Sequence, residues 1–129
     1  MKRAHQSLRH ALHGLQHALA TERNLRLFLG TYLVILILGD IEGISLLQWL
    51  LLIVCGGLFT AVELINTALE RLVDTCDELW RKIDTNANGH HRGLKLTKDV
   101  ASAASLVCLC VNVLVILSIF LPLAVRHLR

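Results

Sequence analysis

Residues 46–74 limit what this chain can fold into more than any other part of the sequence. They begin as an apolar run of leucine, isoleucine, valine and phenylalanine that is typical of a membrane-spanning helix. The run then continues, with no turn signal, into four polar residues: Glu63, Asn66, Glu70 and Asp74. At about 100° per residue, these four side chains fall within roughly 80° of one another on a helix. The segment therefore predicts one helix that carries a polar stripe out of a bilayer.

Composition places the whole chain in the same class. The 129 residues are 54% hydrophobic and include a single proline, and the mean hydropathy is +0.58. These values predict an all-α integral membrane protein with one domain, residues 1–129. The net charge of +3 is too small to indicate a nucleic-acid partner. Because three short spans give one chain little interior of its own, we expect an oligomer.

The cysteines and the N-terminus carry no processing signal. The four cysteines have no CxxC spacing, and three of them lie in apolar runs, where cysteine usually behaves as a small buried hydrophobe. The basic N-terminus has no apolar segment directly behind it, so no removable signal peptide is expected.

Hydrophobic periodicity divides the chain into an N-terminal helix and three spans. Residues 1–22 have an amphipathic pattern that is too polar to cross a bilayer, so this helix should lie along the membrane surface. The spans are expected over residues 25–39, 44–70 and 98–125, the second with a cytoplasmic extension. Residues 75–97 are polar and rich in turn formers, and we expect them to form a cytoplasmic loop.

Lysine and arginine predict the orientation of the spans. Five of them precede the first apolar run, and six lie on or beside the loop between the second and third spans. The first hairpin loop, GDIEG, has none, and the C-terminal tail has only Arg126 and Arg129. Basic residues accumulate on the cytoplasmic side of a membrane. The N-terminus and the long loop should therefore lie inside, and the C-terminus outside.

Polar residues at the ends of the predicted spans should meet at this cytoplasmic boundary. The set consists of Glu22, Glu63, Asn66, Glu70, Lys98 and Asp99. Ionisable groups at membrane depth are costly and usually functional. Each one alone also has a structural explanation, such as a helix cap or an ion pair between Glu22 and Arg26. Six such groups at one depth are harder to explain by packing.

Phosphoryl transfer requires this combination of side chains. The reaction needs a divalent cation held by carboxylates, a positive charge against the polyphosphate and a base that faces the acceptor hydroxyl. Glu22 and Glu70 can supply carboxylates to Mg²⁺ from two helices. Glu63, the deepest of the acids, is placed to meet an alcohol whose tail lies in the bilayer. No GxxxxGK[ST] motif occurs, so a nucleotide must be held through the metal and side chains.

Three motifs together resemble the small prokaryotic diacylglycerol kinase family: TERNLR at residues 21–26, ELINTALERLVD at 63–74 and KDVASAAS at 98–105. The resemblance covers nearly the whole chain. It implies a lipid kinase of the bacterial inner membrane with three spans per chain, a homotrimeric assembly and MgATP as phosphoryl donor. It also implies these roles: general base and lipid contact, Glu63; metal and ATP binding, Glu22 and Glu70; further ATP contacts, Arg3, Asn66, Lys98 and Asp99; a further lipid contact, Ser102.

The resemblance leaves the lipid acceptor open. The TERN form of the first motif is similar to the branch that phosphorylates undecaprenol, whereas ASAAS after Lys98 also suits the diacylglycerol branch. The interval from Asp74 to Lys98 is longer than is usual in the family, so no loop contact to ATP is carried over. His91 is close to the position of a loop histidine of the family.

A noncatalytic membrane scaffold or an ion pathway is the alternative function. An ion pathway should continue ionisable groups across the bilayer. Residues 46–62, however, contain only Gln48, Thr60 and small residues besides the apolar ones. Because the polar set stops at one boundary, the sequence favours catalysis there.

Overall fold

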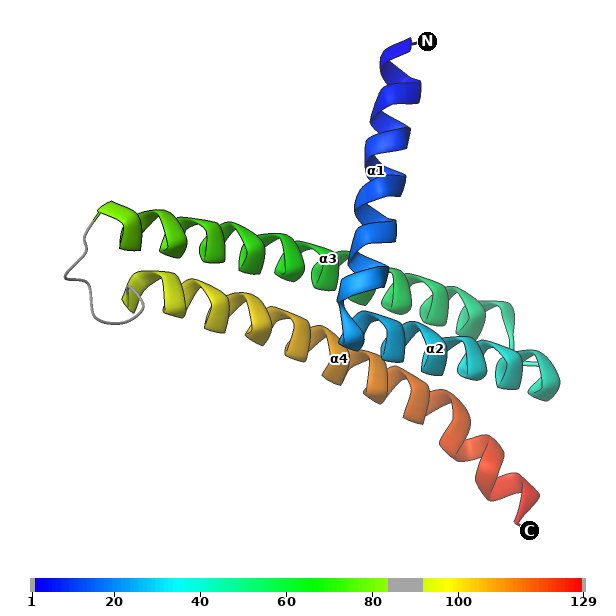
Figure 1. The fold of residues 1–129 in the computed structure, drawn as a ribbon. Helices are drawn as coiled ribbons and strands as arrows, with labels where there is room; N and C mark the ends of the chain where they lie inside the picture. Colours follow the sequence, from blue (N-terminus) through cyan, green and yellow to red (C-terminus); the bar gives the residue numbers. More distant parts are fainter. Residues whose placement is uncertain (1, 84–91, 129) are drawn as a thin grey trace.

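The computed structural model describes residues 2–83 and 92–128, and every regular element within them is an α-helix. The helices are α1 (Lys2–Thr21), α2 (Arg23–Glu42), α3 (Leu46–Ile83) and α4 (Arg92–His127). Helices α2, α3 and α4 run alongside one another in an elongated bundle, and α1 projects away from it (Figure 1). Each of the three bundle helices is long and apolar enough to cross a membrane. The expected architecture of an N-terminal helix followed by three spans is confirmed.

A single non-helical residue separates α1 from α2. Glu22 has extended backbone angles, φ −90° and ψ 109°, and α2 begins directly after it. The Arg26 guanidinium donates hydrogen bonds to the carbonyl oxygens of Leu19 and Ala20 at 2.9 and 2.8 Å. These bonds satisfy carbonyl groups that the end of α1 leaves without helical partners. The change of direction between α1 and α2 is therefore held by the start of α2 itself.

A tight hairpin joins α2 to α3. Gly43 adopts a left-handed conformation, φ 62° and ψ 45°, and the backbone N–H groups of Gly43 and Ile44 bond to carbonyls of the last turn of α2. Glycine is the usual residue for this helix ending because it has no Cβ to clash. Ile44 then packs with Leu52 of α3 and Ile119 of α4 in a small apolar core. The hairpin thus fixes the α2–α3 end of the bundle.

The interval expected as a loop is largely helical. Helix α3 continues to Ile83 and α4 begins at Arg92, so most of residues 75–97 belongs to these two helices. Pairs four residues apart support the extension of α3: Lys82 lies 2.7 Å from Glu78, and Arg81 lies 3.0 Å from Asp77. The turn-rich sequence between the helices, including His91, lies outside the described residues. Pairing within α3 explains why a polar sequence forms a helix here.

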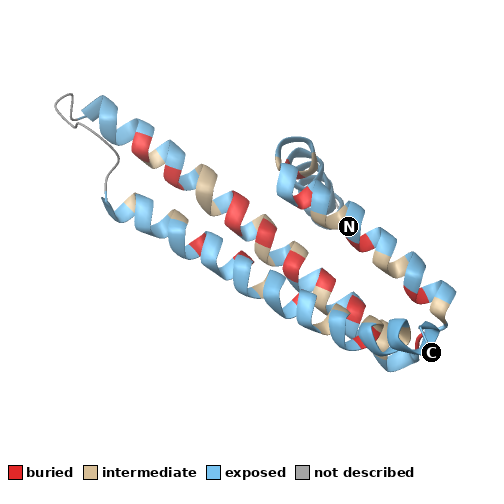
Figure 2. Ribbon diagram, turned by 90° about the horizontal axis from the view of Figure 1, so that it is seen from below, coloured by how far each residue is buried: buried red, intermediate tan, exposed pale blue. Residues whose placement is uncertain are grey.

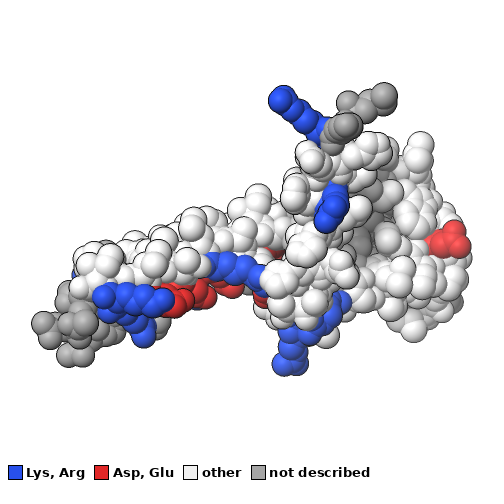
Figure 3. All heavy atoms as spheres, turned by 45° about the horizontal axis from the view of Figure 1, so that its top comes forward, with Lys and Arg blue, Asp and Glu red and all other residues white. Residues whose placement is uncertain are grey.

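Burial follows the face of α3 that is turned toward its neighbours (Figure 2). Outside this seam many large apolar side chains are exposed in the single chain, among them Leu46 at 76% and Ile53 at 59%. Such extended apolar surface is typical of contact with lipid or with other copies. On the face shown in Figure 3, basic residues lie on α1 and toward the α3–α4 loop, whereas the hairpin end shows acidic residues only. All four cysteines are free thiols.

Candidate active site

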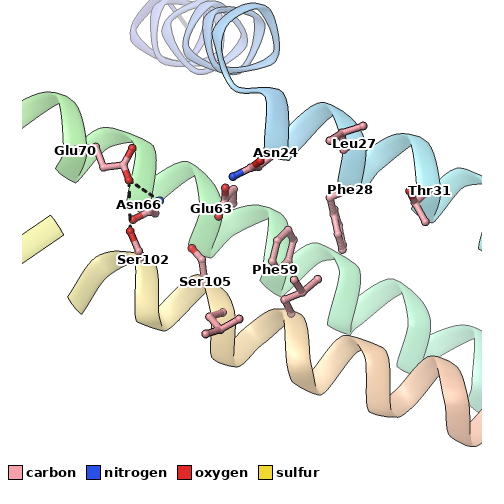
Figure 4. Close-up of a pocket in the computed structure, with 12 residues that line it drawn as sticks. Asn24, Leu27, Phe28, Thr31, Phe59, Glu63, Asn66, Glu70, Ser102 and Ser105 are labelled. Carbon is pink, nitrogen blue, oxygen red and sulfur yellow. Dashed lines mark hydrogen bonds between the residues drawn. The ribbon is translucent and has the colours of Figure 1, made fainter. Parts of the chain in front are cut away.

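A cleft of about 460 Å³ opens on the side of the bundle between α2, α3 and α4. One end of it is polar and the other is apolar (Figure 4). The polar lining consists of Asn24, Thr31, Glu63, Asn66, Glu70, Ser102 and Ser105, and the apolar lining consists of Leu27, Phe28, Phe59, Leu106 and Leu109. The cleft therefore offers both a polar reaction site and a surface for a hydrocarbon chain.

Helical spacing explains how these side chains come together. Glu63, Asn66 and Glu70 follow one another at intervals of three and four residues, which places them on one face of α3. Ser102 and Ser105 are three residues apart on α4, and this helix packs antiparallel to α3 (Figure 1). The structure thus brings four of the residues predicted from the sequence, Glu63, Asn66, Glu70 and Ser102, into one cleft.

The polar end of the cleft is organised around the Glu70 carboxylate. Asn66 Nδ2 donates a hydrogen bond to Glu70 Oε1 at 3.3 Å, and Ser102 Oγ donates to the same oxygen at 3.5 Å. Asn66 Oδ1 is left buried and without a hydrogen-bond partner. These groups present oxygen atoms, which are the ligands that Mg²⁺ prefers. The residues at this end fit a magnesium ion that takes its remaining ligands from phosphate.

Glu63 lies deeper in the cleft in a different environment. Only 7% of the residue is exposed, and its carboxylate makes no hydrogen bond or ion pair with the described residues. On the apolar side of Glu63 the cleft is lined by Phe59 and Phe28, whose ring centroids are 3.9 Å apart. A buried carboxylate without an internal partner is available to accept a proton from a ligand.

Glu22 does not line this cleft within one chain. Its Oε1 lies 3.3 Å from Arg71 Nη2, and the same guanidinium donates to Thr21 Oγ1 at 2.6 Å and contacts the His17 imidazole. The pairing of Glu22 with Arg26 weighed from the sequence is not formed, because Arg26 instead bonds the last carbonyls of α1. Arg71 therefore ties the α1–α2 junction to α3, one residue after Glu70.

Lys98 and Asp99 lie nearer than the cleft to the end of α3 and the start of α4. They line a separate cavity of about 300 Å³ between α3 and α4, together with Asp74 and Asp77. Lys98 Nζ lies 2.9 Å from Asp74 Oδ1. The ammonium of Lys98 on α4 therefore pairs with a carboxylate of α3. Arg3 is exposed in the first turn of α1, away from both cavities.

Several cleft residues were not predicted from the sequence. Asn24 and Ser105 lie within the TERNLR and KDVASAAS motifs, but their spacing gave no separate signal. Phe28 and Phe59 belong to apolar runs in which any position could have faced lipid. The ion pair of Arg71 joins residues 49 positions apart, and no local pattern indicates it.

Three apolar helices and a lateral cleft with acidic residues define a multi-pass membrane protein with a site open to lipid. Comparison with known proteins narrows this class. A family model described as prokaryotic diacylglycerol kinase matches residues 9–120, and the chain belongs to this family. It is therefore a lipid kinase, and kinase activity implies ATP as a substrate. Family membership favours the enzyme over the scaffold and ion-pathway alternatives.

Two relatives of the chain are named as lipid kinases. The chain is 31% identical over 123 residues to an undecaprenol kinase of Bacillus subtilis (strain 168), covering 95% of this chain and 91% of that protein. It is 29% identical over 116 residues to a diacylglycerol kinase of Synechocystis sp., covering 90% of this chain and 61% of that protein. The family resemblance inferred from the three sequence motifs is confirmed.

Proposed function

We propose that this enzyme uses ATP and Mg²⁺ to phosphorylate the hydroxyl of a membrane lipid alcohol, either diacylglycerol or undecaprenol. The observation that carries the proposal is the cleft itself, in which Glu63 and Glu70 line one cavity whose other end is apolar. A lipid can enter such a lateral cleft from the bilayer and present its hydroxyl to the acids. A nucleotide can approach the polar end from water.

Glu63 is the general base in this proposal. The lipid oxygen attacks the γ-phosphorus of ATP, a new O–P bond forms, and the bond to the β–γ bridging oxygen breaks to release ADP. The hydroxyl proton passes to the Glu63 carboxylate. The burial of Glu63 above the Phe28–Phe59 pair supports this role, because the base must meet an alcohol whose tail lies among apolar groups.

Glu70 would hold Mg²⁺ together with phosphate oxygens, and Asn66 Oδ1 lies within the same polar end of the cleft. When bound, the metal neutralises charge on the phosphates. Glu22 is the second proposed carboxylate ligand. Because Arg71 holds it outside the cleft of its own chain, Glu22 would reach the metal by leaving Arg71 or by entering the site of a neighbouring copy. Ser102 would contact the lipid.

The remaining nucleotide contacts are proposed for Asn66, Lys98 and Asp99, with Arg3 supplied by α1. Lys98 and Asp99 lie near the polar end of the cleft, because Asp74, the partner of Lys98, is one helical turn from Glu70. We further propose a homotrimer in the bacterial cytoplasmic membrane, with the N-terminus inside and the C-terminus outside. The apolar surface left exposed on the bundle and the basic residues around α1 support this arrangement.

The test is a phosphorylation assay with purified protein, labelled ATP and Mg²⁺, with diacylglycerol and undecaprenol supplied in separate reactions. Glu63→Gln should lower turnover by about 10²- to 10⁴-fold, the usual contribution of general base catalysis. Glu78→Gln is the matched control, because Glu78 is exposed on the same helix and pairs with Lys82. Turnover that is unchanged in Glu63→Gln would remove Glu63 as the base. No labelled lipid from either acceptor would contradict the proposed function.

A further inference from the structure

Ser105 is a buried hydroxyl that the roles proposed above do not use. Only 8% of the residue is exposed, and Ser105 lines the cleft beside Ser102. Its Oγ has no hydrogen-bond partner among the described residues. In Figure 4 the side chain points from α4 toward α3. The chain therefore holds an unpaired hydroxyl inside the proposed active site.

Three other hydroxyls on the same helices are satisfied locally. Thr60 donates to the Gly56 carbonyl at 2.8 Å, Thr97 donates to the Gly93 carbonyl at 3.0 Å, and Ser118 donates to the Val115 carbonyl at 2.7 Å. Bonding back to the preceding turn is the common solution for serine and threonine within helices. Ser105 does not take it, so the hydroxyl remains directed into the cleft and available to a ligand.

The depth of Ser105 indicates which ligand atoms it would meet. The Ser102–Glu70 contact sets α3 and α4 level with each other at the polar end, and Asn112 Nδ2 bonds to the Cys55 carbonyl at 3.0 Å on the deeper side. From this level, Ser105 lies about 4.5 Å further into the membrane, at 1.5 Å per residue. Glu63 lies about 10 Å from the polar end, but counted from the Asn112–Cys55 contact at the same rise it is level with Ser105 to within about 2 Å. Ser105 therefore lies deeper than the proposed metal ligand and across the cleft from the proposed base.

We propose that Ser105 is a further catalytic residue whose hydroxyl donates a hydrogen bond to a non-bridging oxygen of the phosphoryl group during its transfer. This inference rests on the proposed function, because it places the donor ATP at Glu70 and the acceptor hydroxyl at Glu63. The phosphoryl group must then pass along this part of the cleft, which Ser105 lines from α4. Ser105 gives up no proton, and the lipid proton still goes to Glu63.

The chemistry of the reaction gives such a donor its effect. Charge in the transition state is spread over the three equatorial oxygens of the phosphoryl group. A fixed donor in a site that excludes water stabilises this charge more strongly than it stabilises the bound substrates. The hydroxyl should therefore raise kcat and have little effect on the KM for ATP or on the KM for the lipid.

The experiment compares Ser105→Ala with Ser105→Thr, which keeps a hydroxyl, and with Ser118→Ala, which removes a self-bonded hydroxyl from the same helix. Ser105→Ala should lower kcat by about ten- to a hundredfold with whichever lipid is the acceptor. Both KM values should change by less than about threefold. Ser105→Thr should recover most of the loss, and Ser118→Ala should match the wild type.

A second readout uses ADP with orthovanadate as an analogue of the transferring phosphoryl group. Ser105→Ala should weaken this inhibition by about the same factor as kcat, while the affinity for a non-hydrolysable ATP analogue stays unchanged. An unchanged kcat, an effect confined to KM, or a loss of activity accompanied by lower thermal stability would overturn the role of Ser105. Those results with an active wild type leave the lipid kinase function standing. A wild type that phosphorylates no lipid would instead remove both proposals.

Discussion

Helix α1 buries almost none of its side chains, whereas the paired helices α3 and α4 bury both apolar and polar residues. Among the described side chains of α1, only Ala18 is buried, and most of the leucines are exposed, with Leu8 at 59% and Leu12 at 57%. Helix α3, in contrast, buries Glu63 and Asn66 at membrane depth. A single chain thus builds the polar interior of its site by itself, whereas the apolar face of α1 requires a surface from outside the chain, such as the bilayer.

The Arg71 guanidinium connects α1 to the α3–α4 pair. Arg71 of α3 contacts His17, Thr21 and Glu22, so the position of α1 is coupled to the helix that carries Glu70. The two proposed metal ligands consequently belong to different regions of the molecule. Glu70 belongs to the cleft of the α3–α4 pair, and Glu22 belongs to the junction of α1. Substitutions on each side test whether this division is functional.

Among the substitutions that test this division, the largest effect is expected for Glu70→Gln. This change removes the carboxylate that organises the polar end of the cleft, and we expect turnover to fall by at least about a hundredfold. The activity that remains should require a higher Mg²⁺ concentration. Steady-state kinetics over a Mg²⁺ titration measures both values, with Glu78→Gln as the exposed control. Wild-type kinetics in Glu70→Gln would mean that the cleft is not the metal site.

Glu22→Gln and Arg71→Ala together test whether Glu22 binds the metal or only holds α1 to α3. Loss of a metal ligand should lower turnover by about tenfold or more and raise the Mg²⁺ requirement. Arg71→Ala should lower turnover by less than about fivefold, because an ion pair whose side chains are 41% and 30% exposed contributes only about 0–1 kcal/mol. Equal losses in the two variants would show that Glu22 acts only by holding α1 to α3.

Gly56→Ala should destabilise the contact between α2 and α3. A Cβ at Gly56 would overlap the ring of Tyr32, whose hydroxyl bonds to the Leu52 carbonyl. Such overpacking typically costs about 1–3 kcal/mol. Gly57→Ala is the matched control, because nothing lies within 4 Å of its added Cβ. Thermal unfolding in detergent should show a lower midpoint for Gly56→Ala only, and equal midpoints would place Tyr32 elsewhere.

The smallest effect is expected for Leu12→Gln on the exposed apolar face of α1. If this face binds the bilayer, a polar side chain should weaken its contact by about 1 kcal/mol and leave the cleft unchanged. Hydrogen exchange in lipid bilayers should then be faster for the backbone amides of α1 alone. His10→Gln, on the opposite face, serves as control. Identical exchange in both variants and the wild type would indicate that α1 does not bind lipid through Leu12.

Much of the fold was predictable because its signals are local. Apolar length identified the three spans, and the amphipathic pattern of residues 1–22 identified α1. The interval at residues 75–97 was harder, because its polar composition suggests a loop while pairs such as Glu78–Lys82 stabilise a helix. Within the site, the spacing of Glu63, Asn66 and Glu70 predicted a shared face, and they do line one cleft.

The placement of Glu22 shows where prediction stopped. Its sequence position next to the first span is compatible with the cleft of its own chain, with Arg26 or with a distant partner. Only the packed helices select Arg71, because this contact joins residues 49 positions apart and depends on the direction of α1. Ser105 is a similar case. No sequence pattern explains why the Ser105 hydroxyl stays unpaired while the Ser118 hydroxyl bonds to the Val115 carbonyl.

By itself, the sequence determined that the chain is helical, that it crosses a membrane three times and that Glu63, Glu70 and Asp99 lie toward one end of the spans. These properties follow from hydrophobic length and from the fixed geometry of a helix, which act over neighbouring residues. Tertiary structure decided which polar atoms face one another across the cleft and which stay unpaired. Those contacts depend on the relative depth and rotation of helices, and packing between distant segments fixes both.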